Sequence, residues 1–175
     1  MAHAKHGFVQ RRYQGRCGYC RVSEIDSGGT LTVDHYRPIS QGGDDADDNL
    51  VYACFKCNQF KGDFYPSSAD VLEDRRLLHP LLDDLDQHMR LDEYNGWLRP
   101  LTPTGRFHMA LLQLNRPALV QYRLRRRMLS WLHERRGQLE DEVDMLKSTI
   151  TGLELHVARL ERLLGSSTDL ETSAD

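Results

Sequence analysis

The sequence predicts an α+β fold, with a small N-terminal domain of two short strands and a helix, a connector, and a long C-terminal helix. Three observations predict it. Two Cys-x-x-Cys pairs enclose residues 21–53, two short strand-like segments lie between those pairs, and leucines recur every seven residues near the C-terminus. At 175 residues the chain suits one domain, or a small domain with an extended appendage.

The composition and the charge argue against a membrane protein, a secreted protein or a protein that is basic throughout. Hydrophobic residues make up 39% of the chain and charged residues 28%, and the net charge is −3, so any attraction to nucleic acid must come from local patches. No apolar run approaches the roughly 18–20 residues of a membrane span, and Met1–Gly7 lacks the apolar core of a signal peptide. We therefore expect a cytoplasmic protein with no membrane partner.

The cysteines indicate a structural metal site. In a reducing compartment, disulfides are not expected, whereas two such pairs can converge on one tetrahedral Zn²⁺ ion. The predicted zinc ligands are Cys17, Cys20, Cys54 and Cys57. Paired thiols of a redox or disulfide type are the alternative interpretation.

The segments around the cysteine pairs predict the order strand, loop, strand, helix. Phe8–Arg16 is typical of a short helix or an extended lead-in to the first pair. Thr30–His35 is β-branched and alternating, and it follows a Ser-Gly-Gly turn, so it predicts a strand. Leu50–Ala53 predicts a second strand after a polar loop without periodicity, and "CFKCNQFKGDF" predicts a turn that runs into a short helix.

The second half of the chain carries a hairpin signal and a helix start. Asn95-Gly96 lies between two alternating segments, which is the strongest short-range hairpin signal. Asn115 can cap a helix and Pro117 is tolerated in its first turn. The expected divisions are a domain at residues 1–70, a connector with a hairpin and a helix at 71–116, a long helix at 117–164, and a disordered tail at 165–175.

A strict heptad pattern predicts a coiled coil at the end of the long helix. The d positions are Leu139, Leu146, Leu153 and Leu160, and the a positions are Val143, Ile150, Val157 and Leu164. Leucine at d with mostly β-branched residues at a favours a parallel two-stranded coiled coil, so we expect a homodimer. The facing g and e positions contain no like-charge clash. A helix packed on its own domain, or on a different partner, remains the alternative.

The stretch Val33–Asp63 contains side chains that suit phosphodiester hydrolysis. Such a reaction needs a hard cation and a base that deprotonates a water molecule, and a neutral histidine is suited to the second role near pH 7. Asp34 and His35 end the first predicted strand, where a following Gly-containing loop can direct both groups toward one site. Asn58 and Lys61 lie one helical turn apart on one face, so Lys61 could bind a phosphate oxygen.

This stretch resembles the motif of the HNH endonucleases, which are zinc-containing ββα-metal nucleases. The matching segments, within Gly15–Asp63, are "CGYC", "VDHYRPIS", "GGDDADDNL" and "ACFKCNQFKGD". The resemblance implies that His35 is the general base and that Asp34 and Asn58 bind a catalytic Mg²⁺ or Mn²⁺ ion. It implies that Asn49 holds the loop and orients the backbone or the ring of His35, so the implied catalytic residues are His35, Asn49 and Asn58. Asn58 stands where the family's naming histidine would be, as in some other members.

Downstream segments, including "LLHPLLDDLDQHM", are weakly similar to the region that follows the nuclease in some bacterial HNH proteins of phage defence. Some of those proteins work beside an ATPase. The similarity implies a possible partner ATPase or another protein of a defence system.

Five basic residues are candidates for nucleic-acid binding. They are Arg37, Lys56, Lys61, Arg125 and Arg126. For Arg37 a surface ion pair is the alternative, and for the two arginines of "RLRRRM" a solvated helix face is the alternative. The leading hypothesis is a metal-dependent endonuclease that nicks DNA, or cuts both strands as a dimer, with RNA not excluded. The rival hypothesis is a non-catalytic zinc-knuckle module that binds nucleic acid or protein.

Overall fold

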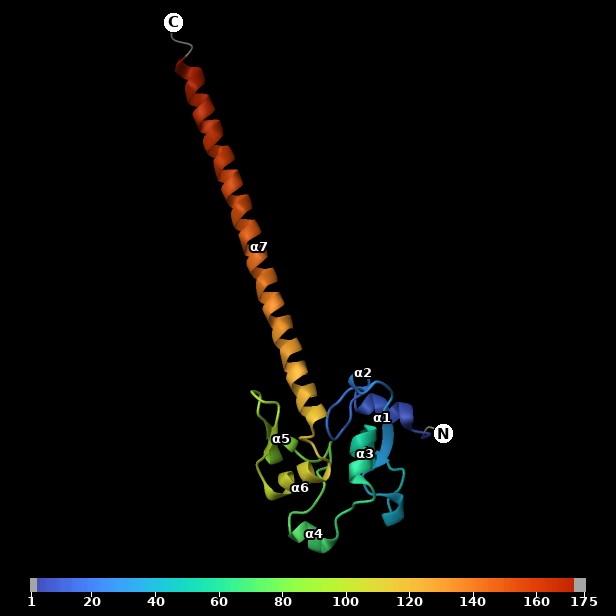
Figure 1. Cartoon of the computed structure of the whole chain (residues 1–175). Helices are drawn as coiled ribbons and strands as arrows, with labels where there is room; N and C mark the ends of the chain where they lie inside the picture. Colours follow the sequence, from blue (N-terminus) through green and yellow to red (C-terminus); the bar gives the residue numbers. More distant parts are fainter. Residues whose placement is uncertain (1–2, 172–175) are drawn as a thin grey trace. The chain divides into compact units, whose positions relative to one another are not determined.

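The computed structural model describes residues 3–171, with side chains as far as Leu163, and it confirms the α+β prediction. The chain divides into two compact units, one ending at Arg127 and the other beginning at Met128 (Figure 1). The first unit contains two small sheets and all the short helices of the described residues. The second unit is the continuation of one long helix.

The first sheet and the helix that follows it form a ββα unit. β1 (Thr32–His35) pairs antiparallel with β2 (Leu50–Ala53), and all four residues of β2 are buried. α3 (Phe55–Lys61) follows β2 directly and lies against β1 (Figure 1). Cys54 caps this helix, because its sulfur accepts a hydrogen bond from the backbone N–H of Cys57.

The observed strands nearly coincide with the predicted ones. β2 spans the four predicted residues, but β1 begins at Thr32 rather than at Thr30. The backbone N–H of Leu31 donates to the hydroxyl of Tyr52, at 3.2 Å, instead of to a strand partner. A tertiary contact therefore shortens β1 at a point that local β propensity cannot reveal.

The loop between β1 and β2 is folded tightly although its sequence shows no periodicity. It contains the 3₁₀ turn η1 (Ile39–Gln41), which ends at Gly42 with a φ of +79°. A Cβ atom at Gly43 would lie 1.9 Å from the carbonyl oxygen of Arg37, so only glycine fits there. The two glycines thus return the loop to the start of β2.

The N-terminal segment packs across the sheet. α1 (His6–Arg12) buries Val9 and contacts β2. The helix ends four residues earlier than predicted, because Gln14 and Gly15 adopt left-handed conformations with φ of +55° and +63°. A short α2 (Glu24–Ser27) then precedes β1.

The connector contains the predicted hairpin and several short helices. Its elements are α4 (Ser68–Leu72), α5 (Leu85–His88), β3 (Met89–Leu91), β4 (Leu98–Pro100) and α6 (Pro103–Leu111). In the hairpin loop, Gly96 has a φ of +74°, and its N–H donates to the carbonyl of Asp92 at 2.8 Å. A Cβ atom at Gly96 would lie 2.9 Å from the backbone oxygen of Val120, so the hairpin packs closely on the long helix that begins at Pro117.

The long helix α7 (Pro117–Glu171) begins inside the first unit. Asn115 does not act as the expected cap. Its side-chain amide instead bonds both the N–H and the carbonyl of Leu98, each at 2.8 Å, and so extends the hairpin. Leu119 and Tyr122 are buried, so the first turns of α7 belong to the core of this unit.

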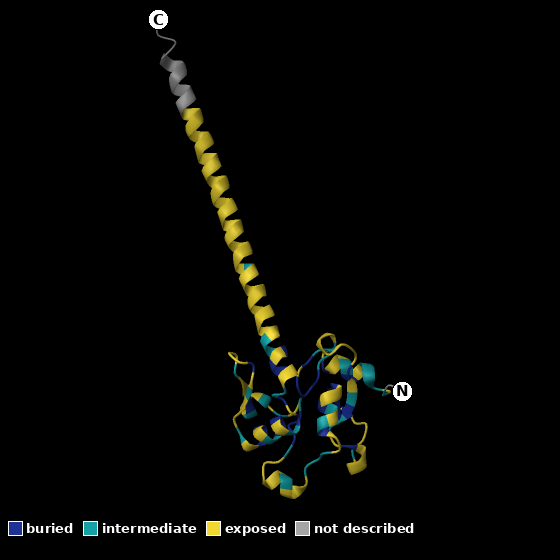
Figure 2. Ribbon diagram, in the orientation of Figure 1, coloured by how far each residue is buried: buried dark blue, intermediate teal, exposed yellow. Residues whose placement is uncertain are grey.

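The second unit exposes the apolar heptad positions (Figure 2). Each is between 45% and 61% exposed, for Leu139, Val143, Leu146, Ile150, Leu153, Val157 and Leu160. The side chain of Leu164 lies outside the described part. Of the predicted tail, residues 165–171 continue the backbone of α7, and residues 172–175 lie outside the described residues. Within the described chain, no helix has the length and apolar character needed to cross a membrane.

Candidate active site and metal centre

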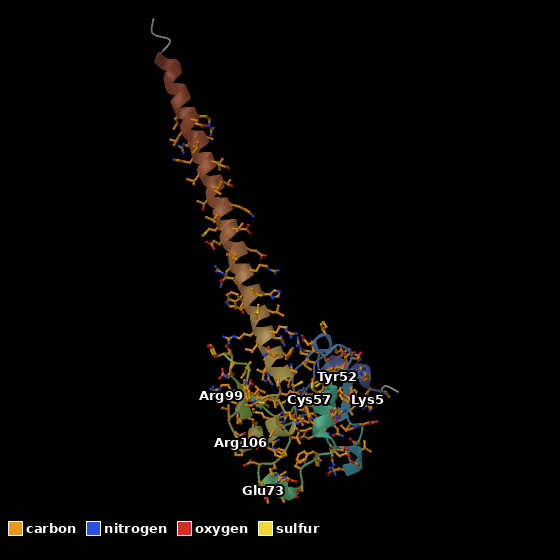
Figure 3. The ribbon with its side chains drawn as sticks, in the orientation of Figure 1. Lys5, Tyr52, Cys57, Glu73, Arg99 and Arg106 are labelled. Atoms are coloured by element: carbon orange, nitrogen blue, oxygen red, sulfur yellow. The ribbon has the colours of Figure 1, made fainter. Side chains whose placement is uncertain are left out.

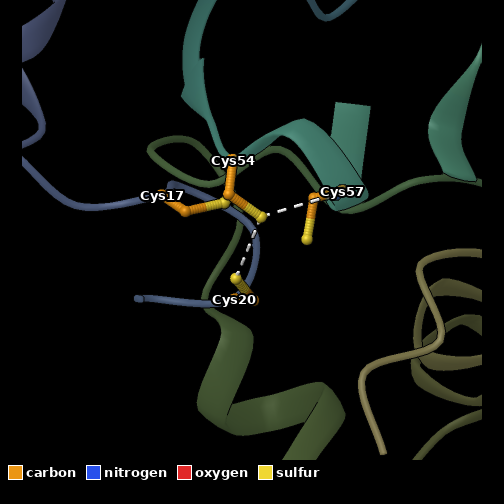
Figure 4. A group of neighbouring side chains, drawn as sticks. All are labelled: Cys17, Cys20, Cys54 and Cys57. Atoms are coloured by element: carbon orange, nitrogen blue, oxygen red, sulfur yellow. Dashed lines mark hydrogen bonds between the residues drawn. The ribbon is translucent and has the colours of Figure 1, made fainter. Parts of the chain in front are cut away.

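The four cysteines come together where the turn at Cys17–Cys20 meets the start of α3 (Figure 4). All are buried free thiols, and their four Sγ atoms lie within 4.8 Å of one another. The Sγ atoms of Cys20 and Cys54 are 3.7 Å apart. A tetrahedral ion with Zn–S bonds of about 2.3 Å would hold its sulfurs about 3.8 Å apart. The donor set and its spacing therefore fit a tetrahedral metal ion.

An arginine lies directly against this cluster. The guanidinium of Arg116 is 3.8 Å from the sulfur of Cys54 and 3.7 Å from that of Cys57. Four thiolates around a divalent ion carry a net negative charge, which a nearby cation stabilises in a poorly solvated site. Arg116 precedes α7 by one residue, so the start of this helix is anchored at the cysteine cluster.

Asp34 points into the core of the ββα unit. One carboxylate oxygen accepts a hydrogen bond from the Tyr19 hydroxyl at 2.7 Å, and the other accepts one from Lys61 at 3.2 Å. Both side chains of the ion pair are nearly fully buried. Burial raises the pKa of Asp34, although the Lys61 ammonium and the Tyr19 hydroxyl oppose this shift by stabilising the carboxylate.

His35 makes its contacts with a different part of the molecule. Its Nε2 atom lies 2.7 Å from a carboxylate oxygen of Asp45, in the loop between the strands. The same oxygen lies 3.2 Å from Nε2 of His3. Hydrogen bonds from His35 and from His3 lower the pKa of Asp45. The contacts of Asp34 and His35 thus diverge, as neighbouring strand residues do.

One cavity nevertheless adjoins the predicted base and the two predicted cation ligands, although Asn49 does not line it. It measures about 370 Å³ and is lined by Asp34, His35 and Asn58, together with Lys61 and residues of the loop after β1. The amide nitrogen of Asn58 lies 3.4 Å from the hydroxyl of Thr32. The structure therefore brings the predicted base and the two predicted cation ligands to one cavity.

The cavity offers oxygen donors that suit a hard cation. Each oxygen of Asp34 accepts one of these hydrogen bonds, and a carboxylate oxygen can accept two. Asn58 adds an amide oxygen, so the donor set fits Mg²⁺ or Mn²⁺ with several water ligands. A cation at Asp34 would share this carboxylate with the ammonium group of Lys61.

Asn49 has a structural position. Its side chain accepts a hydrogen bond from the N–H of Arg37 at 2.7 Å and donates to the carbonyls of Arg37 and Asp44. Its own carbonyl accepts the N–H of Tyr36 at 2.8 Å. Asn49 therefore ties the two ends of the loop together just beyond His35, and these side-chain hydrogen bonds go to backbone groups rather than to the imidazole.

The candidate phosphate contacts on the ββα unit differ in accessibility. Arg37 is exposed, donates to the carbonyl of Gln41 and lies over the ring of Tyr65 at 5.2 Å. Lys56 is exposed and donates to Gln59 at 3.2 Å. Both can approach a polyanion.

Lys61 is only 2% exposed, and besides Asp34 it donates to the carbonyl of His35 at 2.7 Å. It is therefore positioned to hold β1 and α3 together rather than to meet a phosphate at the surface. Arg125 and Arg126 are exposed on α7, where Arg126 lies 3.4 Å from the Tyr122 hydroxyl.

Sequence reasoning missed the partners of His35. His3 and Asp45 are separated by 42 residues, and neither lies in a pattern that pairs them. Lys5, labelled in Figure 3, holds the same loop through the carbonyl of Asp45 and the carboxylate of Asp47, both at 2.7 Å. The run of aspartates in the loop indicated that a carboxylate could contact His35, but not which of them does.

Two antiparallel strands, a following helix and four clustered cysteines that could hold a metal ion define a small ββα domain. Residues 17–64 match the family model described as HNH endonuclease. This match confirms the family resemblance over that part of the chain. No curated protein and no solved structure matches the sequence.

Proposed function

We propose that the protein is a metal-dependent endonuclease that hydrolyses phosphodiester bonds of DNA. The observation that carries the proposal is that Asp34, His35 and Asn58 line one cavity within the segment that matches the HNH endonuclease family. An imidazole beside oxygen ligands provides a base and a cation site in the same place. The four cysteines are proposed to hold a structural zinc ion.

The residues would divide the reaction as follows. His35 accepts a proton from a water molecule while the water oxygen bonds to phosphorus. The bond between phosphorus and the 3′ oxygen breaks, and the leaving oxygen takes up a proton, so the products are a 3′-hydroxyl and a 5′-phosphate. A divalent cation bound by Asp34 and Asn58 would stabilise the charge on the phosphate and on the leaving oxygen. Lys61 helps to keep Asp34 ionised.

The test is cleavage of supercoiled plasmid by the full chain, with Mg²⁺, with Mn²⁺ and with neither. Single-stranded DNA and RNA serve as further substrates. We expect cleavage of DNA only when a divalent cation is added. His35→Ala should reduce the rate by about 10²- to 10⁴-fold, the range for a general base.

The matched control is His133→Ala, which removes an exposed histidine of the second unit. Its cleavage rate should equal that of the wild type, and the thermal unfolding of both variants should show a folded protein. Cleavage by a folded His35→Ala variant at the wild-type rate would rule out the proposed base.

The rival function is a binding module without catalysis. The observation that favours it is that the Asp34 carboxylate is already paired with Lys61 and Tyr19. Binding and cleavage of a labelled DNA duplex, compared between the wild type and His35→Ala, discriminate the two hypotheses. A nuclease would cleave DNA only with His35 present, whereas a binding module would bind DNA and cleave none with either residue at position 35.

We further propose that two copies associate through the second unit. The exposed heptad positions form the kind of apolar stripe that a parallel coiled coil buries. The variant Leu146→Asp places a charge at a d position, and Met145→Asp is the matched control, since Met145 is 64% exposed and lies outside the stripe.

Light scattering should give a dimer for the wild type and for Met145→Asp, and a monomer for Leu146→Asp. Two nucleases held together can cut both strands, so the monomeric variant should accumulate nicked circles before linear plasmid. Equal molecular masses for all three proteins would refute this part of the proposal.

A further inference from the structure

The group around His35 outside the cavity has a defined hydrogen-bond pattern. His3 and His35 each place Nε2 against the same carboxylate oxygen of Asp45, at 3.2 Å and 2.7 Å. Asp45 does not line the cavity that His35 shares with Asp34 and Asn58. His35 therefore lines the cavity and also contacts, through its imidazole, an acidic partner that does not line it.

The partners determine where the protons lie. The backbone N–H of Lys5 donates to Nδ1 of His3 at 3.1 Å, so the proton of a neutral His3 is on Nε2. An ionised carboxylate only accepts hydrogen bonds, so both histidines donate to Asp45 from Nε2. In neutral His35 the nitrogen with a free lone pair is then Nδ1.

The same pattern argues against a metal ion between these three side chains. A histidine that binds a metal through Nε2 normally donates its other N–H to a neighbouring acceptor. In His3 that other nitrogen instead receives an N–H from Lys5. A hydrogen-bonded group agrees with this arrangement, and a two-histidine, one-carboxylate metal site does not.

Asp45 is itself held in place. Lys5 donates to its backbone carbonyl at 2.7 Å and to the carboxylate of Asp47 at 2.7 Å. Arg12 donates to the carbonyl of Asp47 at 2.5 Å. The N-terminal segment thus fixes an otherwise exposed loop at the position where it meets His35.

We propose that Asp45, held by His3 and Lys5, is the positioning residue of this site, which keeps the His35 proton on Nε2 and leaves Nδ1 as the basic nitrogen. The inference rests on the proposed nuclease function for its effect on rate. It goes beyond that function by naming the residue that orients the base and the atom that accepts the proton.

The first experiment observes the imidazole itself in the full chain. In ¹⁵N-labelled protein, His35 should show a hydrogen-bonded Nε2–H proton by NMR. Asp45→Ala should lose this signal, while Asp45→Asn, which keeps an acceptor oxygen, should retain it. Asp48→Ala is the matched control, because it removes an exposed aspartate of the same loop that does not contact His35. A wild-type proton on Nδ1, or a signal unchanged in Asp45→Ala, would overturn the inference.

The second experiment measures cleavage by the same variants. Asp45→Ala should lower kcat by about 10- to 100-fold with little change in KM, since the base is misoriented but substrate contacts remain. Asp45→Asn should recover most of the loss, and Asp48→Ala should match the wild type. An Asp45→Ala variant that cuts as fast as the wild type, or faster, would show that Asp45 does not position the base. A wild-type protein that cuts nothing would defeat the proposed function, and the NMR result would still decide the hydrogen-bond arrangement.

Discussion

Replacing Lys61 by methionine tests whether this lysine holds the fold or contacts substrate. The Asp34–Lys61 ion pair is almost fully buried, with side chains 7% and 1% exposed. Methionine matches the length of the lysine stem but leaves the Asp34 charge without its cation. Removing one partner of a buried pair costs about 3–5 kcal/mol, so the free energy of unfolding should fall by that amount.

The expected loss is a large fraction of the total free energy of unfolding. A domain of this size has an unfolding free energy of about 5–15 kcal/mol. Lys61 also donates to the carbonyls of His35 and Gly62, at 2.7 and 3.3 Å, which methionine cannot replace. Both effects act in the same direction, and neither depends on nucleic acid.

Urea unfolding followed by circular dichroism, with zinc kept in the buffer, measures the change. Lys56→Met is the matched control, because it removes an exposed lysine of the same helix and should change stability by at most about 0.5 kcal/mol. The double variant Asp34→Asn, Lys61→Met should recover part of the loss, since no unpaired charge remains. If Lys61→Met is no less stable than Lys56→Met, the buried ion pair is not what fixes α3 against β1.

Three further outcomes are expected. Burial lowers the pKa of His108 from 6.5 to about 3, so below pH 6.5 the unfolded chain binds a proton that the folded chain does not. Stability should therefore fall as the pH falls, by about 2 kcal/mol between pH 8 and pH 5, and urea titrations should show a weaker dependence in His108→Gln. Elemental analysis should find one zinc per chain. Removal of the zinc by a strong chelator should unfold the first unit reversibly. A chain that folds without zinc would refute the structural site. Gly96→Ala should lower the unfolding free energy by about 1–3 kcal/mol, because the residue has a positive φ and its Cβ would contact α7. The control Gly29→Ala, with open space around the added Cβ, should lower it far less.

The fold was predictable where the signals are local. The two Cys-x-x-Cys pairs require their sulfurs to meet if they bind one ion, and the four sulfurs do cluster. β2 lies at the predicted residues because all four of its side chains are buried, which an apolar run indicates. The heptads predict a long helix by periodicity alone, and α7 contains them all.

The site was predictable only in part, because its contacts join distant residues. The spacing of Asn58 and Lys61 correctly suggested a shared helix face, and both line the cavity. That spacing could not reveal that the facing carboxylate of Asp34 is buried and draws Lys61 inward. Nor could it reveal His3, because a contact between residues 3 and 45 depends on how α1 packs across the sheet.

The contact between Arg116 and the cysteine sulfurs couples loss of a bound ion to unfolding at the start of α7. The guanidinium lies where it would offset the negative charge of metal-bound thiolates, and the same residue directly precedes α7. An oxidant or chelator that removed a bound ion would therefore also weaken the contact that holds the N-terminal end of α7. Conversely, interactions that hold the N-terminal end of α7 in place should slow the dissociation of the ion.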